Sequence, residues 1–133
     1  MFVSNLRQGD FLIASIHAAL DDAELERFQR EMIDQIGARR ANGIIIDIAA
    51  LDVLDSFGSS CLLTLARIAK LRGAETVIVG IQPEVAYAIV RLGMSLDVHT
   101  ALDLEQGLTT LERLTTGRRT GESTLQSLRE RDG

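Results

Sequence analysis

The sequence predicts an α/β fold: a mixed β-sheet with helices, in which an opening β-hairpin is followed by alternating strands and helices. Apolar, β-branched runs such as residues 44–48 alternate with amphipathic segments of roughly 10–18 residues. A turn signal, Gly9-Asp10, separates two short runs near the start of the chain. The chain has 133 residues, which is enough for one domain with its own core.

The first elements follow from local patterns. The runs on either side of the turn signal predict the two strands of the hairpin, within residues 2–16. A helix is predicted to begin at Asp21, with Glu24 completing a capping box, and to end at Asn42-Gly43. Its apolar residues recur at helical spacing: Leu25, Phe28, Met32, Ile33 and Ile36.

The middle of the chain predicts a buried strand followed by a second helix. Residues 44–48 are Ile-Ile-Ile-Asp-Ile, a run typical of an interior strand that is buried on both faces. The helix over residues 57–72 is followed by Gly73, which suits the position after a helix C-cap. One face of this helix is apolar: Cys61, Leu62, Leu65, Ile68 and Ala69.

The same pattern then repeats. Residues 76–79 predict a strand, Pro83 suits the first turn of the next helix, and residues 98–100 predict a short edge strand. The apolar residues of the Pro83 helix cover more than one face, so we expect part of it to be exposed: Val85, Tyr87, Ile89 and Val90.

A last helix is predicted after Asp103, its N-cap, with three leucines expected in the core: Leu104, Leu108 and Leu111. From Gly117 onward the chain is polar. We therefore expect a single domain over residues 1–116 and a mobile tail over residues 117–133.

Composition and motifs argue against several function classes. The net charge is −5 and the chain lacks the basic stripe of a nucleic-acid binder. One cysteine and two distant histidines predict neither a disulfide nor a metal site. Phosphate-loop, dinucleotide-binding and nucleophile-elbow motifs are missing, and we interpret Asp47 as a structural, hydrogen-bonded carboxylate. We expect no enzyme and no cofactor.

Neither a signal peptide nor a membrane span is predicted. The first residues are mixed in character, and no apolar run approaches the ~20 residues that cross a bilayer. We expect a cytoplasmic protein.

The most informative stretch is residues 51–60, LDVLDSFGSS, between the buried strand and the helix after it. Binding surfaces of α/β sheets form where strands end in this way. Ser56 directly precedes the predicted helix, and serine is a preferred N-cap. From the residues alone, we therefore predict Ser56 as the N-cap.

The charge around Ser56 suggests a second role. No basic residue lies between Arg40 and Arg67, whereas three acids crowd the approach: Asp47, Asp52 and Asp55. A phosphate on Ser56 would be tolerated by the helix dipole but would find no local cation to neutralise it. The hypothesis is a binding switch, in which the added charge repels a docked partner.

At this point the residues resemble a known family. Asp55-Ser56, at the start of a helix after a buried strand, resembles the STAS domain (sulfate transporter and anti-sigma-factor antagonist). Three downstream segments are similar to its stressosome, RsbS-like branch: residues 80–86, 90–94 and 100–107. The resemblance covers roughly residues 8–114. Many antagonist-type STAS domains have Ser or Thr after the acceptor, where this chain has Phe57.

The resemblance implies a non-enzymatic scaffold of the general stress response. Such proteins co-assemble with RsbR-type STAS paralogues, sequester an RsbT-type serine/threonine kinase and release it when phosphorylated; an RsbX-type phosphatase resets the state. The phosphate acceptor falls on Ser56. The expected partner-binding residues surround it: Asp52, Asp55, Ser56, Phe57, Gly58 and Ser59.

Two alternatives stay open. One is a freestanding anti-sigma-factor antagonist regulated at the same serine. The other is a small-molecule module at a strand end, for which a nucleotide near Ser56 is disfavoured because residues 41–66 contain no cation.

Overall fold

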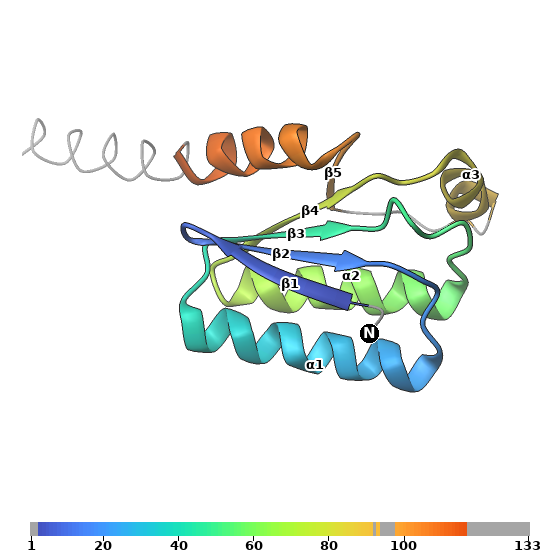
Figure 1. Ribbon diagram of the computed structural model, residues 1–133, viewed down its shortest axis with the longest axis horizontal. Coiled ribbons are helices and arrows are strands. Elements are labelled where there is room, and N and C mark those ends of the chain that lie inside the picture. The colour runs from blue at the N-terminus through green and yellow to red at the C-terminus, as the bar shows by residue number, and fades with distance from the viewer. Residues whose placement is uncertain (1–2, 92, 94–97, 117–133) are drawn as a thin grey trace, which may run out of the picture.

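The computed structural model describes residues 3–91, 93 and 98–116. The predicted tail, residues 117–133, lies outside them. A helix without a label in Figure 1 covers residues 104–116 and is called the C-terminal helix below. The other elements, in chain order, are β1 (Val3–Gln8), β2 (Phe11–Ile16), α1 (Asp22–Arg39), β3 (Gly43–Asp47), α2 (Ser56–Leu71), β4 (Glu75–Val79), α3 (Pro83–Arg91) and β5 (His99–Ala101).

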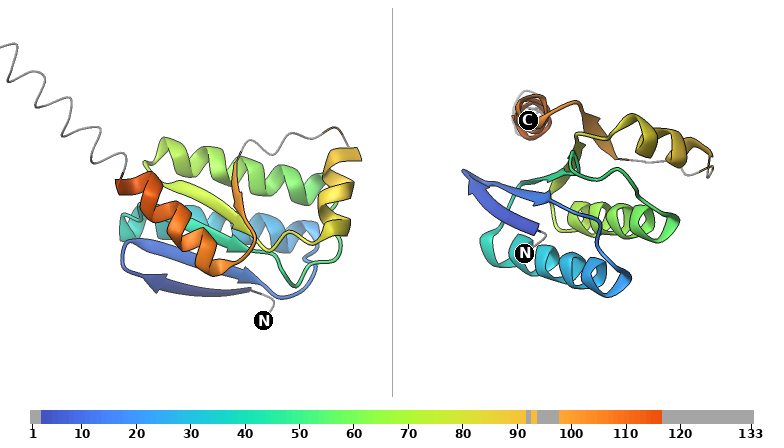
Figure 2. Two further views of the ribbon diagram at one scale, coloured as in Figure 1. Left: turned by 90° about the horizontal axis from the view of Figure 1, so that it is seen from above. Right: turned by 45° about the vertical axis from the view of Figure 1, so that its right-hand side comes forward.

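The strands form one five-stranded sheet in the order β1-β2-β3-β4-β5. β1 is antiparallel to β2, and the remaining neighbours are parallel. α1 and α2 lie side by side on one face, and the C-terminal helix lies across the other (Figures 1 and 2). α3 lies near the end of the sheet where the parallel strands finish (Figure 1). The predicted mixed sheet, opening hairpin and β–α alternation are confirmed.

The core lies on both faces of β3. Ile44 and Ile46 pack in the cluster formed with α1 and α2, whereas Ile45 packs with Leu111 of the C-terminal helix. Ile44, Ile45 and Ile46 are all 0% exposed, which confirms the prediction of an interior strand. Because successive strand residues point to opposite faces, the isoleucine run serves both layers.

The predicted start of α1 is confirmed, but its predicted end was wrong. Asp21 and Glu24 form the capping box. The helix ends at Arg39, followed by Arg40 in the left-handed conformation with φ of 49°. Asn42 comes after the helix, directly before β3, and its backbone N–H donates to the carbonyl of Asp10 in the β1–β2 turn at 2.9 Å.

The C-terminal helix confirms two predictions and corrects one. Asp103 accepts a hydrogen bond from the backbone N–H of Gln106 at 2.8 Å, as an N-cap does. Leu111 is fully buried, but Leu104 is 37% exposed, so its assignment to the core was wrong. Gly107, one turn later, lies directly against the sheet: a Cβ there would lie 2.6 Å from Val79 Cγ1.

α3 is only partly covered, as predicted. Val85 and Ile89 are buried, whereas Tyr87 is 65% and Val90 76% exposed. Among the helices in the described ranges, none combines the length and the apolar character that a membrane crossing requires.

Candidate functional site

The chain between β3 and α2 is firmly held. The backbone N–H of Ala49 donates to the Asp47 carboxylate at 2.9 Å, and that of Ile48 donates to the carbonyl of Val79 at 3.0 Å. The first of these bonds confirms that the Asp47 carboxylate is hydrogen-bonded at the strand end, as predicted. Leu51 and Leu54 then turn inward and are buried. The loop therefore has a defined shape where it reaches α2.

The loop after β4 packs against the loop between β3 and α2. Gly80 adopts φ of +75°, and a Cβ there would lie 2.8 Å from Ala49 Cβ and 3.0 Å from Ala49 Cα. The side-chain amide of Gln82 donates to the carbonyl of Ala49 at 2.6 Å. The two loops pack backbone to backbone because residue 80 has no side chain.

The N-cap of α2 is Asp55, so the prediction that Ser56 caps the helix was wrong. The Asp55 carboxylate accepts from the backbone N–H of Gly58 at 2.7 Å, and Ser56 is the first residue of the helix. A carboxylate caps well here because it also meets the positive end of the helix dipole. The Ser56 hydroxyl is thus not needed to start the helix.

The predicted site residues divide by exposure. Asp52, Asp55 and Ser56 are exposed, and Phe57 is half-buried. Gly58 and Ser59 are buried, Ser59 completely. Gly58 lies under the loop, because a Cβ there would come within 2.8 Å of Leu54 Cδ1. In this conformation only the first four present surface to another protein.

The surroundings of Ser56 are negatively charged in the folded structure, as the sequence suggested. No ion pair to Asp52 or Asp55 occurs within the described part of the chain. Burial raises the pKa of the Cys61 thiol, one turn further along α2, and Glu26, Asp22 and Asp55 raise it further. Acids of α1 therefore act on the first turns of α2.

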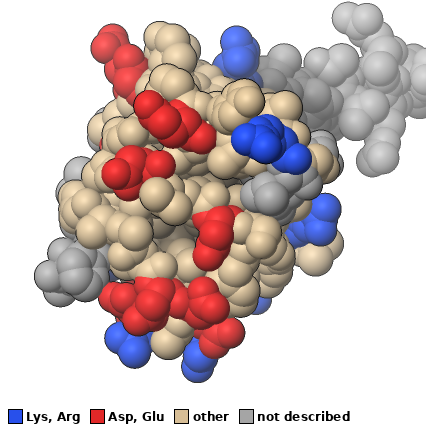
Figure 3. Space-filling model, turned by 90° about the vertical axis from the view of Figure 1, so that its right-hand side faces the viewer, with Lys and Arg blue, Asp and Glu red and all other residues tan. Residues whose placement is uncertain are grey.

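Figure 3 looks onto the side of the molecule where the parallel strands end. Acidic side chains are spread over this face from its upper left to its lower edge, and most of the basic ones lie towards its margins (Figure 3). Such a field favours a basic or neutral partner and opposes an acidic one.

The capping role of Asp55 can be tested by its effect on the stability of the protein. Asp55→Ala should lower the free energy of unfolding by about 1 kcal/mol, because the Gly58 N–H loses its acceptor. Asp52→Ala is the matched control: Asp52 is exposed and shows no hydrogen bond within the described residues, so little change is expected. Urea denaturation of both variants measures the difference. Equal losses would contradict the assignment of the cap.

The site shows no metal-binding constellation. Within the described ranges, no group of three or more His, Cys, Asp or Glu side chains is placed to hold an ion. The site does offer the exposed hydroxyl of Ser56, at the start of α2. It directly follows the hydrogen-bonded loop and lies among carboxylates.

Comparison with known proteins agrees with this fold. The model of the STAS domain family matches residues 3–107, and the chain belongs to that family. Within the family it is similar to proteins of the stressosome. A serine-to-glutamate variant of RsbS from Moorella thermoacetica is 34% identical, with a TM-score of 0.77, over 86% of this chain and 97% of that one.

Two further relatives point the same way. A chain from the solved molecular architecture of the stressosome, described as a signal integration and transduction hub, is 32% identical with a TM-score of 0.69, over 84% of this chain and 98% of that one. The RsbT co-antagonist protein RsbRA of Bacillus subtilis is 28% identical over 97 residues, 72% of this chain. The chain spans only about a third of the length of such curated relatives, 35% of RsbRA.

Proposed function

We propose that this chain is a non-enzymatic scaffold of a stressosome, that it sequesters an RsbT-type serine/threonine kinase, and that phosphorylation of Ser56 releases the kinase. In this role it co-assembles with RsbR-type paralogues in the cytoplasm, and an RsbX-type phosphatase removes the phosphate. The likeness to RsbS over 97% of that chain supports the scaffold role.

The observation that carries the switch is the placement of Ser56. Its side chain is exposed, it follows the N-cap instead of being the cap, and no hydrogen bond of its hydroxyl is found within the described residues. A kinase can reach this hydroxyl without unfolding the helix. Ser59, one turn on, is fully buried and is unsuited to the same reaction.

The charges explain why phosphate would release a partner instead of reorganising the fold. A phosphate adds about −1.5 to −2 charges at neutral pH. The helix N-terminus tolerates an anion, and the first basic residue along α2 is Arg67. The new charge would therefore stay directed at the partner, next to Asp52 and Asp55.

The proposed contact surface consists of Asp52, Asp55, Ser56 and Phe57. Phe57 is half-buried, so part of its ring is available to a partner while the rest is packed. Aromatic residues in such positions are enriched among those that dominate binding energy.

The direct test is phosphorylation in vitro. The protein is incubated with an RsbT-type kinase and ATP, and the modified residue is located by mass spectrometry. We expect one phosphate on Ser56 and none on Ser59. Ser60→Ala serves as the matched control, because Ser60 is an exposed serine of the same helix that the proposal does not use. Phosphate that persists in Ser56→Ala would refute the assignment.

A freestanding anti-sigma-factor antagonist remains the alternative. SpoIIAA, whose structure is described as that of an anti-sigma factor antagonist, shares the fold with a TM-score of 0.64 at 15% identity. Light scattering of the protein mixed with RsbR-type paralogues separates the two. A large mixed assembly is expected for the scaffold, and a monomer or dimer would favour the antagonist.

A further inference from the structure

A small apolar cleft opens beside the start of α2, where two loops meet. One loop joins β2 to α1 and the other joins β3 to α2, and both lie at the end of the sheet where the parallel strands finish (Figure 1). The cleft has a volume of about 100 Å³. Of the described residues that line it, only Asp55 is polar, and the others are aliphatic side chains and Gly58.

The mouth of the cleft is accessible from solvent. Val53 is 64% exposed, Ala19 is exposed and Leu20 is half-buried. Leu25 and Leu54 form the inner wall, and they are only 6% and 8% exposed. An apolar group that enters the cleft would therefore exchange contact with water for contact with aliphatic side chains, which is the main favourable contribution to most protein association.

The size of the cleft selects a small aliphatic group. An apolar protein cavity of about 150 Å³ holds benzene, so 100 Å³ suits a group of about four carbon atoms, such as the side chain of leucine or isoleucine. Sites for small organic ligands measure roughly 300–1,000 Å³ and carry several polar groups that orient the ligand. Here the Asp55 carboxylate already accepts from the Gly58 N–H at 2.7 Å. The lining therefore fits the side chain of a protein partner better than a free ligand.

The cleft is continuous with the proposed switch surface. Asp55 lines the cleft and directly precedes Ser56 in the chain. Val53, at the mouth, belongs to the same loop as the exposed Asp52. A protein docked on Asp55 and Ser56 would therefore also lie against the mouth of the cleft.

We propose that the cleft binds an aliphatic side chain of the RsbT-type kinase, about the size of leucine or isoleucine. This inference rests on the proposed function and extends its contact surface to Ala19, Leu20 and Val53. It also supplies a reason for release. An aliphatic group beside Ser56 excludes water, and residues 41–66 contain no cation, so a phosphate enclosed there would lose its hydration without gaining a partner from this stretch.

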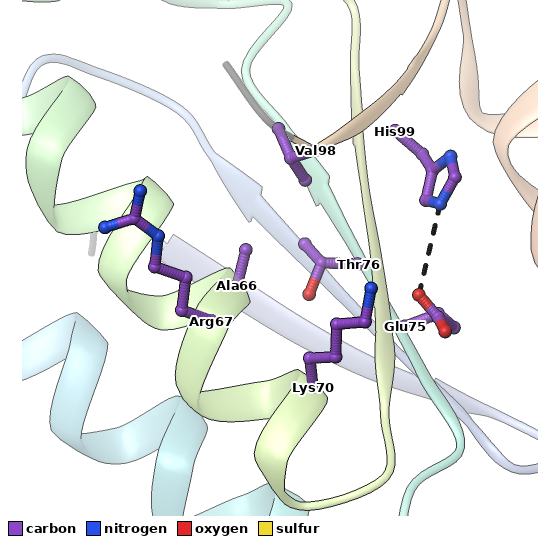
Figure 4. A pocket seen from close by; sticks show the side chains of 7 residues that line it. All are labelled: Ala66, Arg67, Lys70, Glu75, Thr76, Val98 and His99. Atoms are coloured by element: carbon purple, nitrogen blue, oxygen red, sulfur yellow. Dashed lines mark ion pairs between the residues drawn. The ribbon is translucent and has the colours of Figure 1, made fainter. Parts of the chain in front are cut away.

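The cavity on the flank of the molecule, between α2 and the strands β4 and β5, does not offer this chemistry. Charged side chains of α2 and β4 line it, and Lys70 extends from α2 toward Glu75 (Figure 4). Lys70 also follows Ser56 by 14 positions on α2, which places it about 20 Å along the helix axis. A kinase side chain that senses the charge of Ser56 therefore belongs in the apolar cleft.

The test compares the kinase affinities of two variants at the mouth of the cleft by calorimetric titration. Ala19→Phe places a large side chain there, and Val53→Ser removes part of the apolar wall. Each should weaken binding about tenfold or more, as the loss of an anchoring contact does. Both positions are exposed, so both variants should keep the fold, which thermal denaturation checks.

Matched controls carry the same substitutions far from the cleft. Ala38→Phe changes an exposed alanine in the last turn of α1, and Leu71→Ser changes the last residue of α2, which is 87% exposed. These last turns lie at the opposite end of the sheet from the two loops (Figure 1). Neither control should change the affinity for the kinase. Equal weakening by the controls would overturn the inference, since it would show a general effect of the surface.

Two further results would contradict the inference in different ways. If Ala19→Phe and Val53→Ser bind the kinase normally while Ser56→Asp does not, the cleft lies outside the contact and the proposed function stands without it. If the unmodified protein does not bind the kinase, the proposed function fails and the inference fails with it.

Light scattering of the isolated variants tests the other occupant, a second copy of this chain. A change of oligomeric state in Ala19→Phe and Val53→Ser, with unchanged kinase affinity, would assign the cleft to self-association and overturn the proposal. We expect the oligomeric state of both variants to match that of the unmodified protein.

Discussion

Ser56→Asp is expected to weaken binding of an RsbT-type kinase by at least about tenfold, whereas Ser56→Ala keeps binding near that of the unmodified protein. The aspartate adds a charge beside Asp52 and Asp55, where the described residues provide no ion pair to neutralise it. A charge enclosed in a protein contact without an opposite charge to pair with must be desolvated, which costs several kcal/mol. Calorimetric titration with the kinase measures both affinities.

The stability of Ser56→Asp shows whether a loss of binding comes from the added charge or from unfolding. An acidic residue in the first turn of α2 is favourable toward the helix dipole, by about 0.3–1 kcal/mol, so Ser56→Asp should fold at least as stably as the unmodified protein. Ser60→Asp adds an equal charge at another exposed position of the helix and should affect binding much less. Equal affinities for Ser56→Asp and Ser56→Ala would count decisively against the switch.

Gly80→Ala is expected to lower the free energy of unfolding by about 2–5 kcal/mol. Two effects add. A left-handed backbone costs a non-glycine residue about 1–2 kcal/mol, and overpacking costs about 1–3 kcal/mol. Both apply, because φ is +75° and the new Cβ would lie 3.0 Å from the backbone of Ala49. Guanidinium denaturation measures the loss.

Gly73→Ala is the matched control for this effect. Its φ is +84°, but a Cβ there meets nothing within 4 Å, so only the backbone cost of about 1–2 kcal/mol should remain. The difference between the two variants isolates the contact between the loops. Equal losses would show that the Gly80 contact with Ala49 does not support the loop. Gly80→Ala should also weaken kinase binding, since Ala49 belongs to the loop that carries Ser56.

Much of the fold follows from local patterns. The capping box at Asp21, the interior strand β3 and the cap at Asp103 were predicted because each depends on a few adjacent residues. The end of α1 and the burial of Leu104 were predicted wrongly, since both depend on where the sheet lies. Asn42, just before β3, is held by a backbone hydrogen bond to Asp10, which is 32 positions earlier in the chain.

The sequence located the candidate site but did not decide which of its residues caps the helix. Aspartate and serine are both preferred N-caps, so spacing alone could not choose between Asp55 and Ser56. Phosphorylation of Ser56 stays a prediction.

By itself, the sequence determined the class of fold and a stretch of chain without cations, since periodicity and charge are local properties. Only the tertiary structure decided which hydroxyls are accessible. Leu62 and Leu65 pack in the core and set the rotation of α2, which buries Ser59 and leaves Ser56 in solvent. The rotation depends on contacts of Leu62 and Leu65 with side chains of α1 and of the strands. Such contacts join segments far apart in the chain, so the pattern of residues within one segment does not show them.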